Sequence, residues 1–526
     1  MRFLIVGAGP AAAAAALALS GTEHQVTVVD IGATLEEPNA SILRRVSHQE
    51  RRDWTTEDLS VLTKKGQRSA TSRLPQKLTF GSDFPFRDAG QIGEMSQNHV
   101  EGSLVSGAFG GFSNVWGAQA LPFATTELAE WPDGTGELAR HYAAVAGMMP
   151  ISGSAGDALF QALPAYGEMR RPLPLPAPAQ KILDSAERHR KSLAREGVTI
   201  GQSRIAVDAD RCVRCGHCMT GCPLDLTFSA RHPLHAFIAS GAVTYIPGMR
   251  AESIQGSDPV RVICTELTSS RTVTFEADRV LLACGVVGSA RIVMRSLARF
   301  DTPIQIQESM QFTVPVINRR GSADPRREAR PTFGELSLLV RFREESPLGH
   351  LQLYTYDPAL LDALPPLFNR LPQRMTAPLL SRLHVGLGYL PSSVCPSISL
   401  ALRRQSGGDR LELTANSAPL AATSSLMRAL LRKLGRTAGR TGIHPLTPLA
   451  RLSPQGKSYH LGGSFAHATS PTTLQTNALG EIASLPRVHL VDASVLPMIS
   501  STTITYTVMA NAHRITNALV EGAPES

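Results

Sequence analysis

The sequence has few aromatic residues, few charges for its length and no long hydrophobic run. Phe, Trp and Tyr make up 5% of its 526 residues, so few rings are available for stacking on a sugar. Charged residues make up 18% and hydrophobic ones 43%, which excludes a disordered polypeptide and allows a large buried core. No stretch of 18 apolar residues is present, so we expect no membrane-spanning helix.

A secretory signal is also lacking. Met1 and Arg2 lead directly into an expected strand at residues 3–6, and the next apolar stretch is an alanine-rich helix that the fold itself requires. We therefore expect a cytoplasmic protein. Thiols stay reduced in that compartment, so clustered cysteines there indicate metal or redox chemistry rather than disulfides.

Basic residues outnumber acidic ones, 52 to 44, which gives a net charge of +8 and a pI near 9.3. Proteins that bind nucleic acid gather such charge into a patch. Here the arginines are scattered along the chain, for example Arg44, Arg45, Arg51, Arg52, Arg170, Arg171, Arg319 and Arg320. We expect no nucleic-acid partner. In the predicted helix 427–440, Arg428, Arg432 and Arg436 follow a four-residue spacing that is typical of a solvated face.

Seven cysteines are too few for a disulfide framework, yet four of them lie within 11 residues. Their pattern, Cys212-x2-Cys215-x2-Cys218-x3-Cys222 followed by a proline, is the ligand run of bacterial ferredoxins. Zinc sites usually pair two CxxC halves across a longer loop, so zinc and an empty motif are the weaker alternatives. The run predicts an iron–sulfur cluster.

The spacing leaves the type of cluster open. In two-cluster ferredoxins the fourth cysteine of such a run binds the other cluster, and this chain has no second run. Either all four thiols hold one [4Fe-4S] cluster, which we favour, or three hold a [3Fe-4S] cluster. A third alternative is a distant thiol among Cys264, Cys284 and Cys395, although each of these is expected as a small buried hydrophobic side chain.

The first 30 residues predict a dinucleotide-binding unit. A short apolar strand runs into GAGPAA at residues 7–12, and an alanine-rich helix and a second strand follow. Gly7 permits a tight turn, Gly9 lets backbone N–H groups approach a pyrophosphate, and Ala12 lets the helix pack closely on the sheet. Asp30 ends the second strand, where a carboxylate accepts hydrogen bonds from a ribose.

The turn alone does not decide between FAD and NAD. A later segment, VLLACGVVGS at residues 280–289, is typical of a buried strand that runs into a glycine turn and a helix. A FAD-binding domain that is interrupted by long insertions needs such a returning strand. The order of segments therefore favours FAD.

Four segments carry a family resemblance: GAGPAA at the N-terminus, GGFSNVWG at residues 110–117, VLLACGVVGSARI, and a C-terminal block that runs from SYHLGGS to VDASVLP. In these segments and in their order the chain resembles the glucose-methanol-choline (GMC) oxidoreductases, FAD enzymes that oxidise alcohols. The resemblance covers about a third of the chain, mostly in the flavin half.

The resemblance implies roles for particular residues. Gly7, Gly9 and Asp30 would bind the ADP part of FAD, with Ala12 supporting the helix. The residues that would contact the rest of FAD are Gly110, Gly111, Asn114, Trp116, Asp492, Ala493 and Thr505. His460 matches the histidine beside flavin N5, where a neutral imidazole accepts the alcohol proton, and an ordinary histidine pKa of about 6.5 suits that task.

Two positions depart from the family pattern. The second active-site residue of the family, a histidine or asparagine, falls on Thr503, whose hydroxyl hydrogen-bonds but is no base at neutral pH. The catalytic pair would then be His460 and Thr503, which leaves another substrate or direction of electron flow open. Members with covalent flavin carry a histidine in the glycine loop where this chain has Val115, so we expect noncovalent FAD.

Within the family the chain is most similar to the large subunits of bacterial sugar and polyol dehydrogenases, which add an iron–sulfur cluster bound by a cysteine run in mid-chain. This resemblance implies a dehydrogenase in which flavin takes two electrons as hydride and a cluster releases them singly. The substrate would be an alcohol, a sugar or a biosynthetic intermediate. The electrons would pass to an external acceptor, either a small redox protein or a partner subunit.

The predicted fold class is α/β (α+β). A Rossmann-like FAD-binding domain is assembled from residues 1–300 and 451–526, with a cluster loop at 205–230, and residues 301–450 form an antiparallel substrate domain. That domain carries the strand-like segments QFTVPVIN, ELSLLVRF, HLQLYTY, RLHVGLGYL, SISLALR and DRLELTA. A leucine- and proline-rich insertion at 358–383 is expected to pack on it as a helix, with a lid or a hydrophobic partner surface as the alternative.

Three functions are compatible with these features. The leading hypothesis is an alcohol dehydrogenase that contains FAD and an iron–sulfur cluster. The departure at Thr503 favours, as an alternative, a flavoenzyme of other chemistry such as a desaturase, isomerase or reductase. A third hypothesis is a noncatalytic electron-transfer or assembly protein that keeps both cofactors.

Overall fold

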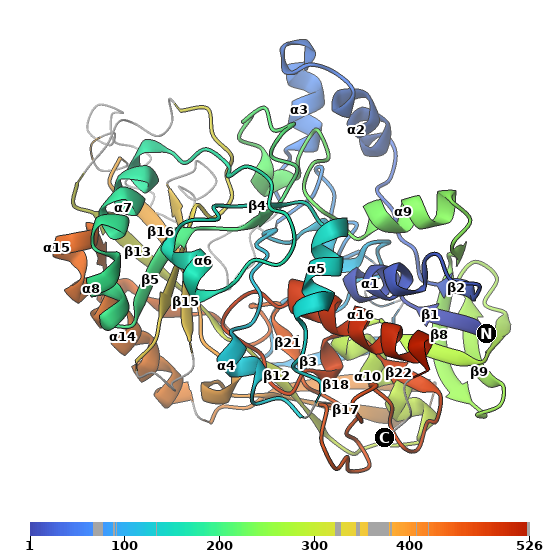
Figure 1. The fold of residues 1–526 in the computed structure, drawn as a ribbon. Coiled ribbons are helices and arrows are strands. Elements are labelled where there is room, and N and C mark those ends of the chain that lie inside the picture. The colour runs from blue at the N-terminus through green and yellow to red at the C-terminus, as the bar shows by residue number, and fades with distance from the viewer. Residues whose placement is uncertain are drawn as a thin grey trace.

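The computed structural model describes residues 1–66, 77–87, 90, 92–132, 134–320, 328–342, 348–355, 378, 381–406, 408–418 and 420–522. Most of the predicted insertion at 358–383 lies outside this part of the chain, so its expected helix stays a prediction. Strands in several sheets form the interior, and helices lie outside them (Figure 1).

A five-stranded parallel sheet contains the N-terminal strand. Its order is β22-β11-β1-β2-β7. The strands are β1 (Arg2–Val6), β2 (Gln25–Val29), β7 (Thr244–Ile246), β11 (Arg279–Leu282) and β22 (Val488–Leu490). They come from three distant parts of the chain and all pair in parallel. The sheet is therefore assembled from discontinuous segments, as the returning strand in the sequence predicts.

Helix α1 (Pro10–Leu19) begins directly after the first glycine turn and packs against α16 (Thr505–Glu521). Ala11 to Ala16 are all buried, because small side chains let the helix approach its neighbours closely. On the other side, α10 (Gly285–Ser296) starts from the glycine turn after β11. Two helix N-termini thus point toward the same edge of the parallel sheet.

A seven-stranded antiparallel sheet lies at the other end of the molecule. Its order is β19-β13-β16-β15-β14-β5, and β20 also pairs with β13. The strands are β5 (Val198–Gln202), β13 (Gln311–Asn318), β14 (Leu336–Val340), β15 (Gly349–Thr355), β16 (Leu383–Tyr389), β19 (Ile443–Pro445) and β20 (Arg451–Leu452). One face packs in a separate hydrophobic core with α7 (Ala177–Arg188), α8 (Arg190–Arg195) and α14 (Leu420–Arg436). Strand β5 joins this sheet although it precedes residue 301.

A third sheet, β21-β12-β17-β18-β3, connects the two halves. Its strands are β3 (Glu94–Asn98), β12 (Ile304–Glu308), β17 (Ile398–Gln405), β18 (Gly408–Ala415) and β21 (Leu461–Gly462). All six strand-like segments of the sequence are strands, but SISLALR and DRLELTA belong here rather than beside the other four. The pairing of β12 with β21 holds the C-terminal segment next to the seven-stranded sheet.

The remaining elements are short or lie at the surface. The helices are α2 (Asn39–Ser47), α3 (Thr56–Leu62), α4 (Thr125–Leu128), α5 (Ala139–Met148), α6 (Ala158–Ala162), α9 (Arg231–Ala239) and α15 (Ala438–Thr441). The strands are β4 (Ile151–Ser152), β6 (Ile205–Ala206), β8 (Met249–Gln255), β9 (Val260–Glu266) and β10 (Thr272–Ala277). Short 3-10 turns include η3 (Gly111–Asn114), η4 (Cys218–Thr220) and η8 (Ala493–Val495).

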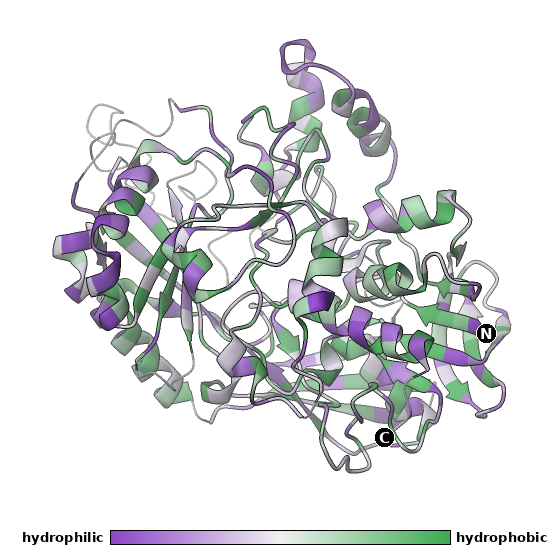
Figure 2. Ribbon diagram, viewed as in Figure 1, coloured by the Kyte–Doolittle hydropathy of each residue, from purple (hydrophilic) through white to green (hydrophobic). Residues whose placement is uncertain are grey.

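Hydropathy follows this arrangement. Figure 2 shows hydrophobic residues along the sheets and hydrophilic ones on the outer turns of α3 and α15. Helix α14 buries Leu430 and Leu434, whereas Arg428, Arg432 and Arg436 are exposed, which confirms the predicted solvated face. Among the described residues, none of the helices combines the length and hydrophobicity that a bilayer crossing requires.

Candidate active site

A cavity of about 1570 Å³ runs from the first glycine turn to one face of the seven-stranded sheet. Ordinary ligand pockets measure roughly 300 to 1,000 Å³, so this cavity has room for a nucleotide cofactor and a second molecule. The predicted site residues on its wall are Gly7, Gly9, Asp30, Gly111, Trp116, His460, Asp492, Ala493, Thr503 and Thr505. The others, Ala12, Gly110, Asn114 and the four clustered cysteines, lie behind the wall.

The two glycines of the first turn differ in their surroundings. Gly7 has a φ of +99°, and a Cβ at this position would lie 2.6 Å from the carbonyl oxygen of Ala283. Gly9 has no atom within 4 Å of the position of a Cβ, because that position opens into the cavity. The turn therefore has the shape that a pyrophosphate needs, with backbone at the surface and no side chain in the way.

Asp30 places a carboxylate at the end of β2 on the cavity wall. The hydroxyl of Tyr245 donates to its Oδ2 over 3.4 Å. Burial raises the pKa of Asp30 to about 7. The buried carboxyl is where a ribose hydroxyl of a bound dinucleotide would donate a hydrogen bond.

Asp492 lies on the cavity wall, but its carboxylate makes its hydrogen bonds to neighbouring protein groups. Its carboxylate accepts hydrogen bonds from the Ser289 hydroxyl at 2.5 Å and from the Ser494 N–H at 2.9 Å. Burial raises its pKa. The residue caps the short turn η8 and so fixes Ala493 at the cavity wall.

His460 lies where three elements meet. Its carbonyl accepts a hydrogen bond from the Ser309 N–H at 3.1 Å, and its own N–H donates to the Ser458 hydroxyl at 3.2 Å. Ser458 in turn donates to the buried carboxylate of Glu308 at the end of β12. Tyr459, with a φ of +57°, turns the chain immediately before the histidine. This non-glycine residue in a left-handed conformation is a strained position of the kind found at functional sites.

The ring of His460 belongs to an aromatic column. It stacks on Tyr389 with the ring centres 4.5 Å apart, and the ring of His350 lies near that of Tyr389, with the centres 6.4 Å apart. Within the described residues, Nδ1 of His460 has no hydrogen-bond partner. Burial lowers the pKa of His460 to about 3, with a smaller contribution from His350. The ring is therefore neutral at physiological pH, and the ordinary pKa of about 6.5 that the sequence suggested is wrong.

Thr503 lies on the cavity wall between Leu121 and the start of α16. Its hydroxyl oxygen accepts a hydrogen bond from the Leu121 N–H at 3.1 Å. The hydroxyl proton is then left to donate into the cavity. Thr503 can donate a hydrogen bond to an alcohol or carbonyl oxygen, but it cannot take up a proton from it.

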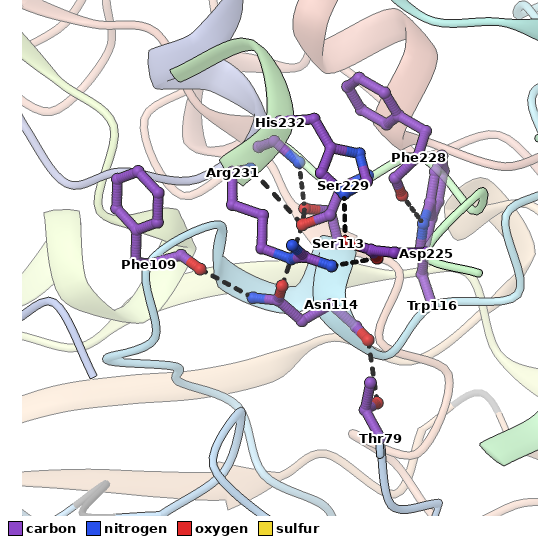
Figure 3. Close-up of polar contacts among 11 residues, drawn as sticks. Thr79, Phe109, Ser113, Asn114, Trp116, Asp225, Phe228, Ser229, Arg231 and His232 are labelled. Atoms are coloured by element: carbon purple, nitrogen blue, oxygen red, sulfur yellow. Dashed lines mark hydrogen bonds and ion pairs between the residues drawn. The ribbon is translucent and has the colours of Figure 1, made fainter. Parts of the chain in front are cut away.

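The glycine loop, residues 110–117, is connected to the segment that follows the cysteine run (Figure 3). The Asn114 side chain donates to the carbonyls of Phe109 and Gly111, both at 2.9 Å, and accepts from the Ser229 hydroxyl at 2.9 Å. Its side chain therefore holds the loop together and does not reach the cavity. The Trp116 indole donates to the carbonyl of Phe228 at 2.9 Å.

The four clustered cysteines form a partly buried loop. Thr332 donates its N–H to the sulfur of Cys218 at 3.4 Å, and Phe80 donates its N–H to the carbonyl of Thr220 at 2.8 Å. The thiol of Cys218 interacts electrostatically with those of Cys215 and Cys222. Burial raises the pKa of the Cys222 thiol to about 12 and that of Cys218 further. These two thiols are therefore protonated when free, and iron uptake would release their protons.

The clustered thiols do not converge on a single point among the described residues. All seven cysteines are free thiols. Among the described residues, no group of three or more His, Cys, Asp or Glu side chains converges as around a single metal ion. In a [4Fe-4S] cluster each thiolate binds a different iron atom, so the sulfurs lie farther apart than around one zinc ion. A buried N–H donor to sulfur also suits such a cluster.

Three residues lie between the main cavity and the cysteine loop. Trp116, Lys77 and Ser113 line both the large cavity and a small cavity of about 30 Å³ that Cys218 and Cys222 also line. Lys77 donates to the Trp116 carbonyl at 2.7 Å, and burial lowers its pKa to about 8. Met219, between the cysteines, lies on the large cavity itself. The cysteine loop thus contacts the wall of the cavity.

Three residues of this site escape the sequence analysis: His350, Tyr389 and Lys77. The first two are brought to His460 by the pairing of β15 with β16, where His350 lies opposite Tyr389. Strand register over this distance leaves no motif. Lys77 follows a segment without a motif, and nothing in its neighbourhood signals the cysteines.

Comparison with known proteins agrees with these observations. Residues 204–230 match a family model described as a 4Fe-4S binding domain. No curated protein matches the chain by sequence. The solved structures similar to it include pyridoxine 4-oxidase from Mesorbium loti, a GMC oxidoreductase, with a TM-score of 0.59 and 14% identity over 99% of each chain. The chain has the GMC fold.

This fold confirms the resemblance and the fold class that the sequence predicts, a Rossmann-like unit combined with an antiparallel sheet. The GMC fold also explains why the C-terminal strand β22 returns to the sheet that β1 begins. The cysteine run is matched by a 4Fe-4S domain over residues 204–230. The domain limits and the individual site residues stay predictions.

Proposed function

We propose that the protein is a FAD-dependent dehydrogenase that oxidises a CH–OH substrate and passes electrons through an iron–sulfur cluster to an external acceptor. The observation that carries the proposal is the shared wall: Trp116, Lys77 and Ser113 line both the cavity of His460 and the small cavity beside Cys218 and Cys222, and Met219 of the cysteine loop lines the large cavity itself. A cavity of cofactor size and a cluster loop would have no reason to share a wall in a protein that used only one of them.

The residues present fit both cofactors. For FAD they supply a glycine turn open at Gly9, a buried carboxylate at Asp30 and the start of α16 at Thr505. FAD, when bound, supplies an acceptor for two electrons as hydride. Cys212, Cys215, Cys218 and Cys222 would hold the cluster, which supplies a one-electron carrier. Val115 in the glycine loop offers no attachment for covalent flavin.

In this proposal His460 receives the proton of the substrate hydroxyl. Burial keeps the ring neutral above about pH 3, so a ring nitrogen can accept a hydrogen bond from the substrate hydroxyl and takes up its proton only as the hydride leaves. The same burial makes the protonated ring unstable, so the proton must leave before the next turnover. Thr503 donates its hydroxyl proton to the substrate oxygen and thereby orients it.

The same geometry serves the reverse direction. A hydroxyl donor at Thr503 and a ring that gives up a proton readily also suit the reduction of a carbonyl group. A carbonyl reductase on this fold is therefore the second candidate. Incubating oxidised and reduced protein with an alcohol and its aldehyde separates the two.

The decisive measurement is an absorption spectrum of anaerobically purified protein together with iron and acid-labile sulfide counts. We expect flavin bands and iron and sulfide in equal amounts. Flavin bands without iron would contradict the proposed cluster, and iron without flavin bands would contradict the proposed dehydrogenase activity.

The variant His460→Gln tests the role of the histidine. It should slow substrate-driven flavin bleaching by about 100-fold or more, since general-base catalysis contributes roughly that much. The exposed His444 provides the control, His444→Gln, with unchanged bleaching.

A further inference from the structure

The face of the seven-stranded sheet that lines the cavity has a regular pattern. Along β13 the odd-numbered residues, Gln311 to Ile317, are half-buried on the cavity wall, while the even-numbered ones are buried. Strand register places each of them beside a partner on β16: Gln311 opposite Tyr389, Thr313 opposite Leu387, Pro315 opposite Val385 and Ile317 opposite Leu383. The wall therefore consists of four rows, numbered here from His460 outward.

Polarity falls from row to row. The first row, Gln311 and Tyr389, carries an amide and a phenol beside His460. In the second row Leu387 lies between Thr313 and Gln352, and the Gln352 amide oxygen accepts from the Tyr354 hydroxyl of the third row at 2.9 Å.

The outer rows are apolar. Apart from the Tyr354 hydroxyl, the third row presents Pro315 and Val385, and the fourth presents Ile317 and Leu383. On the other side of β13, Leu446 lies beside Pro315 and also lines the cavity, as does Arg451 of β20, which lies opposite Thr313 of the second row. Among the described residues of β13, β15 and β16, no charged side chain lines the cavity.

The decrease in side-chain polarity from the first row to the fourth favours one class of substrate. Hydroxyl groups of a sugar that lay against the outer rows would lose their water without gaining partners. An alkyl chain or ring skeleton would instead gain from burial there. Six residues of an antiparallel strand span about 20 Å, so the wall is long enough for an elongated molecule.

We propose that the substrate is an elongated and largely apolar alcohol, whose hydroxyl end lies at His460 and Thr503 and whose apolar part extends along the outer two rows. This inference rests on the proposed function for the reactive group. The position of the apolar part rests on the sheet face alone.

The test uses the holoprotein and straight-chain primary alcohols of four, six, eight and ten carbons. Anaerobic flavin bleaching gives kcat/KM for each. Burial of one methylene is worth about 0.8 kcal/mol, so kcat/KM should rise about fourfold for each added carbon. Glucose and glycerol should bleach the flavin at least 100-fold more slowly than decanol.

A binding measurement distinguishes a failure of this inference from a failure of the proposed function. The methyl ethers of the same alcohols have no hydroxyl to oxidise, and titration calorimetry should show their affinity rising with chain length. Should the ethers follow chain length while no alcohol bleaches the flavin, the apolar site stands and the dehydrogenase fails. Oxidation of alcohols or sugars without dependence on chain length would overturn the apolar substrate and leave the dehydrogenase standing. Ether affinities that are independent of length overturn the apolar site.

Variants place the apolar part on the sheet. Val385→Ser should lower kcat/KM for decanol at least tenfold more than for butanol, because only the long chain reaches the third row. Leu420→Ser is the matched control, since Leu420 is 42% exposed at the start of α14 and does not line the cavity. An equal loss for butanol and decanol would contradict the placement. The chain-length series of the unchanged protein tests the inference even where a variant fails to fold.

Discussion

Two glycines in the first turn, two residues apart, have different physical requirements. A methyl group at Gly7 would meet the carbonyl oxygen of Ala283, and its φ of +99° is costly for any side chain. We expect Gly7→Ala to lower the free energy of unfolding of the apoprotein by about 2 kcal/mol or more and to abolish flavin binding.

Gly9→Ala is the matched comparison. Its methyl group would project into the open cavity without touching the protein. Apoprotein stability in urea should stay within about 0.5 kcal/mol of the unchanged chain, while flavin retention on gel filtration is lost. Equal destabilisation by both variants would contradict the assignment of Gly9 to the cofactor.

A buried histidine outside the candidate active site makes the free energy of unfolding sensitive to acid. His384 is fully buried on β16, and within the described residues neither ring nitrogen has a hydrogen-bond partner. Burial, and to a lesser degree Arg330, lowers its pKa to about 3. The unfolded chain takes up a proton below about pH 6.5 that the folded chain refuses, so this contribution favours folding above pH 6.5 and is lost as pH falls.

Between pH 7 and pH 5 His384 should therefore cost about 2 kcal/mol of stability. His384→Leu removes this loss, so urea midpoints measured at both pH values should fall less on acidification than those of the unchanged protein. The exposed His444→Leu serves as control. Parallel pH dependence in all three proteins would show that His384 is protonated in the folded state.

The sequence predicts the residues that local motifs define and misses those that distant strands bring in. Gly7, Gly9 and the cysteine run belong to contiguous patterns, and His460 follows from a family resemblance. His350 and Tyr389 reach His460 only through the register of β15 and β16, two strands separated by a long insertion. The pKa of His460 depends on burial among these residues, so the sequence could suggest only the ordinary value.

At the scale of elements, the glycine loop and the cluster loop behave as one unit. The Asn114 side chain makes two hydrogen bonds within the glycine loop and a third to Ser229 after the cysteine run, and truncation would remove all three. Asn114→Ala should lower the free energy of unfolding by about 2 to 4 kcal/mol. It should also speed the loss of iron to a chelator, followed by the visible absorption of the cluster.

Trp116→Phe is the control, since it keeps a ring and removes a single bond, from the indole N–H to the Phe228 carbonyl. The expected loss is about 1 kcal/mol, with a smaller effect on iron release. Iron release that is unchanged in Asn114→Ala would show that the two loops move independently.

The strands show what sequence periodicity can and cannot predict at the scale of elements. Alternation of apolar and polar residues identified QFTVPVIN, which is β13 over its full length, and five further strands. Periodicity states which residues face one way but not which sheet receives the strand. For that reason β17 and β18 join β12 and β3, and β5 joins the seven-stranded sheet from an earlier part of the chain.

At the scale of the whole molecule, the chain brings three sheets around one cavity and places the cysteine loop at the outer side of its wall. The order of segments along the sequence implies the parallel sheet, but not that Trp116, Lys77 and Ser113 would lie between the cavity and the cysteines. That relation arises because the segment after the cysteines is bound to the glycine loop. In the proposed function it sets the direction in which electrons leave.

The outer side of the cysteine loop is positively charged. Arg211 and Arg214 are exposed on the loop itself, and Arg51 donates to the carbonyl of Val213 at 3.2 Å. A cationic exit favours an acidic electron carrier, because opposite charges raise the rate of encounter and salt screens that attraction. We expect the rate of reduction of an acidic ferredoxin-type carrier to fall at least tenfold between low and high ionic strength.

Reversing two of these charges tests whether the electron carrier docks at the cysteine loop. The double variant Arg211→Glu, Arg214→Glu should slow reduction of the acidic carrier at least tenfold at low salt, as measured by stopped flow with prereduced protein. Reduction of a small uncharged dye should be unaffected, because the dye needs no electrostatic attraction. The control reverses Arg428 and Arg432 on the exposed face of α14, at the far end of the molecule (Figure 1), and keeps the same total charge change. If both pairs slow the carrier equally, the effect comes from net charge and the carrier does not dock at the cysteine loop.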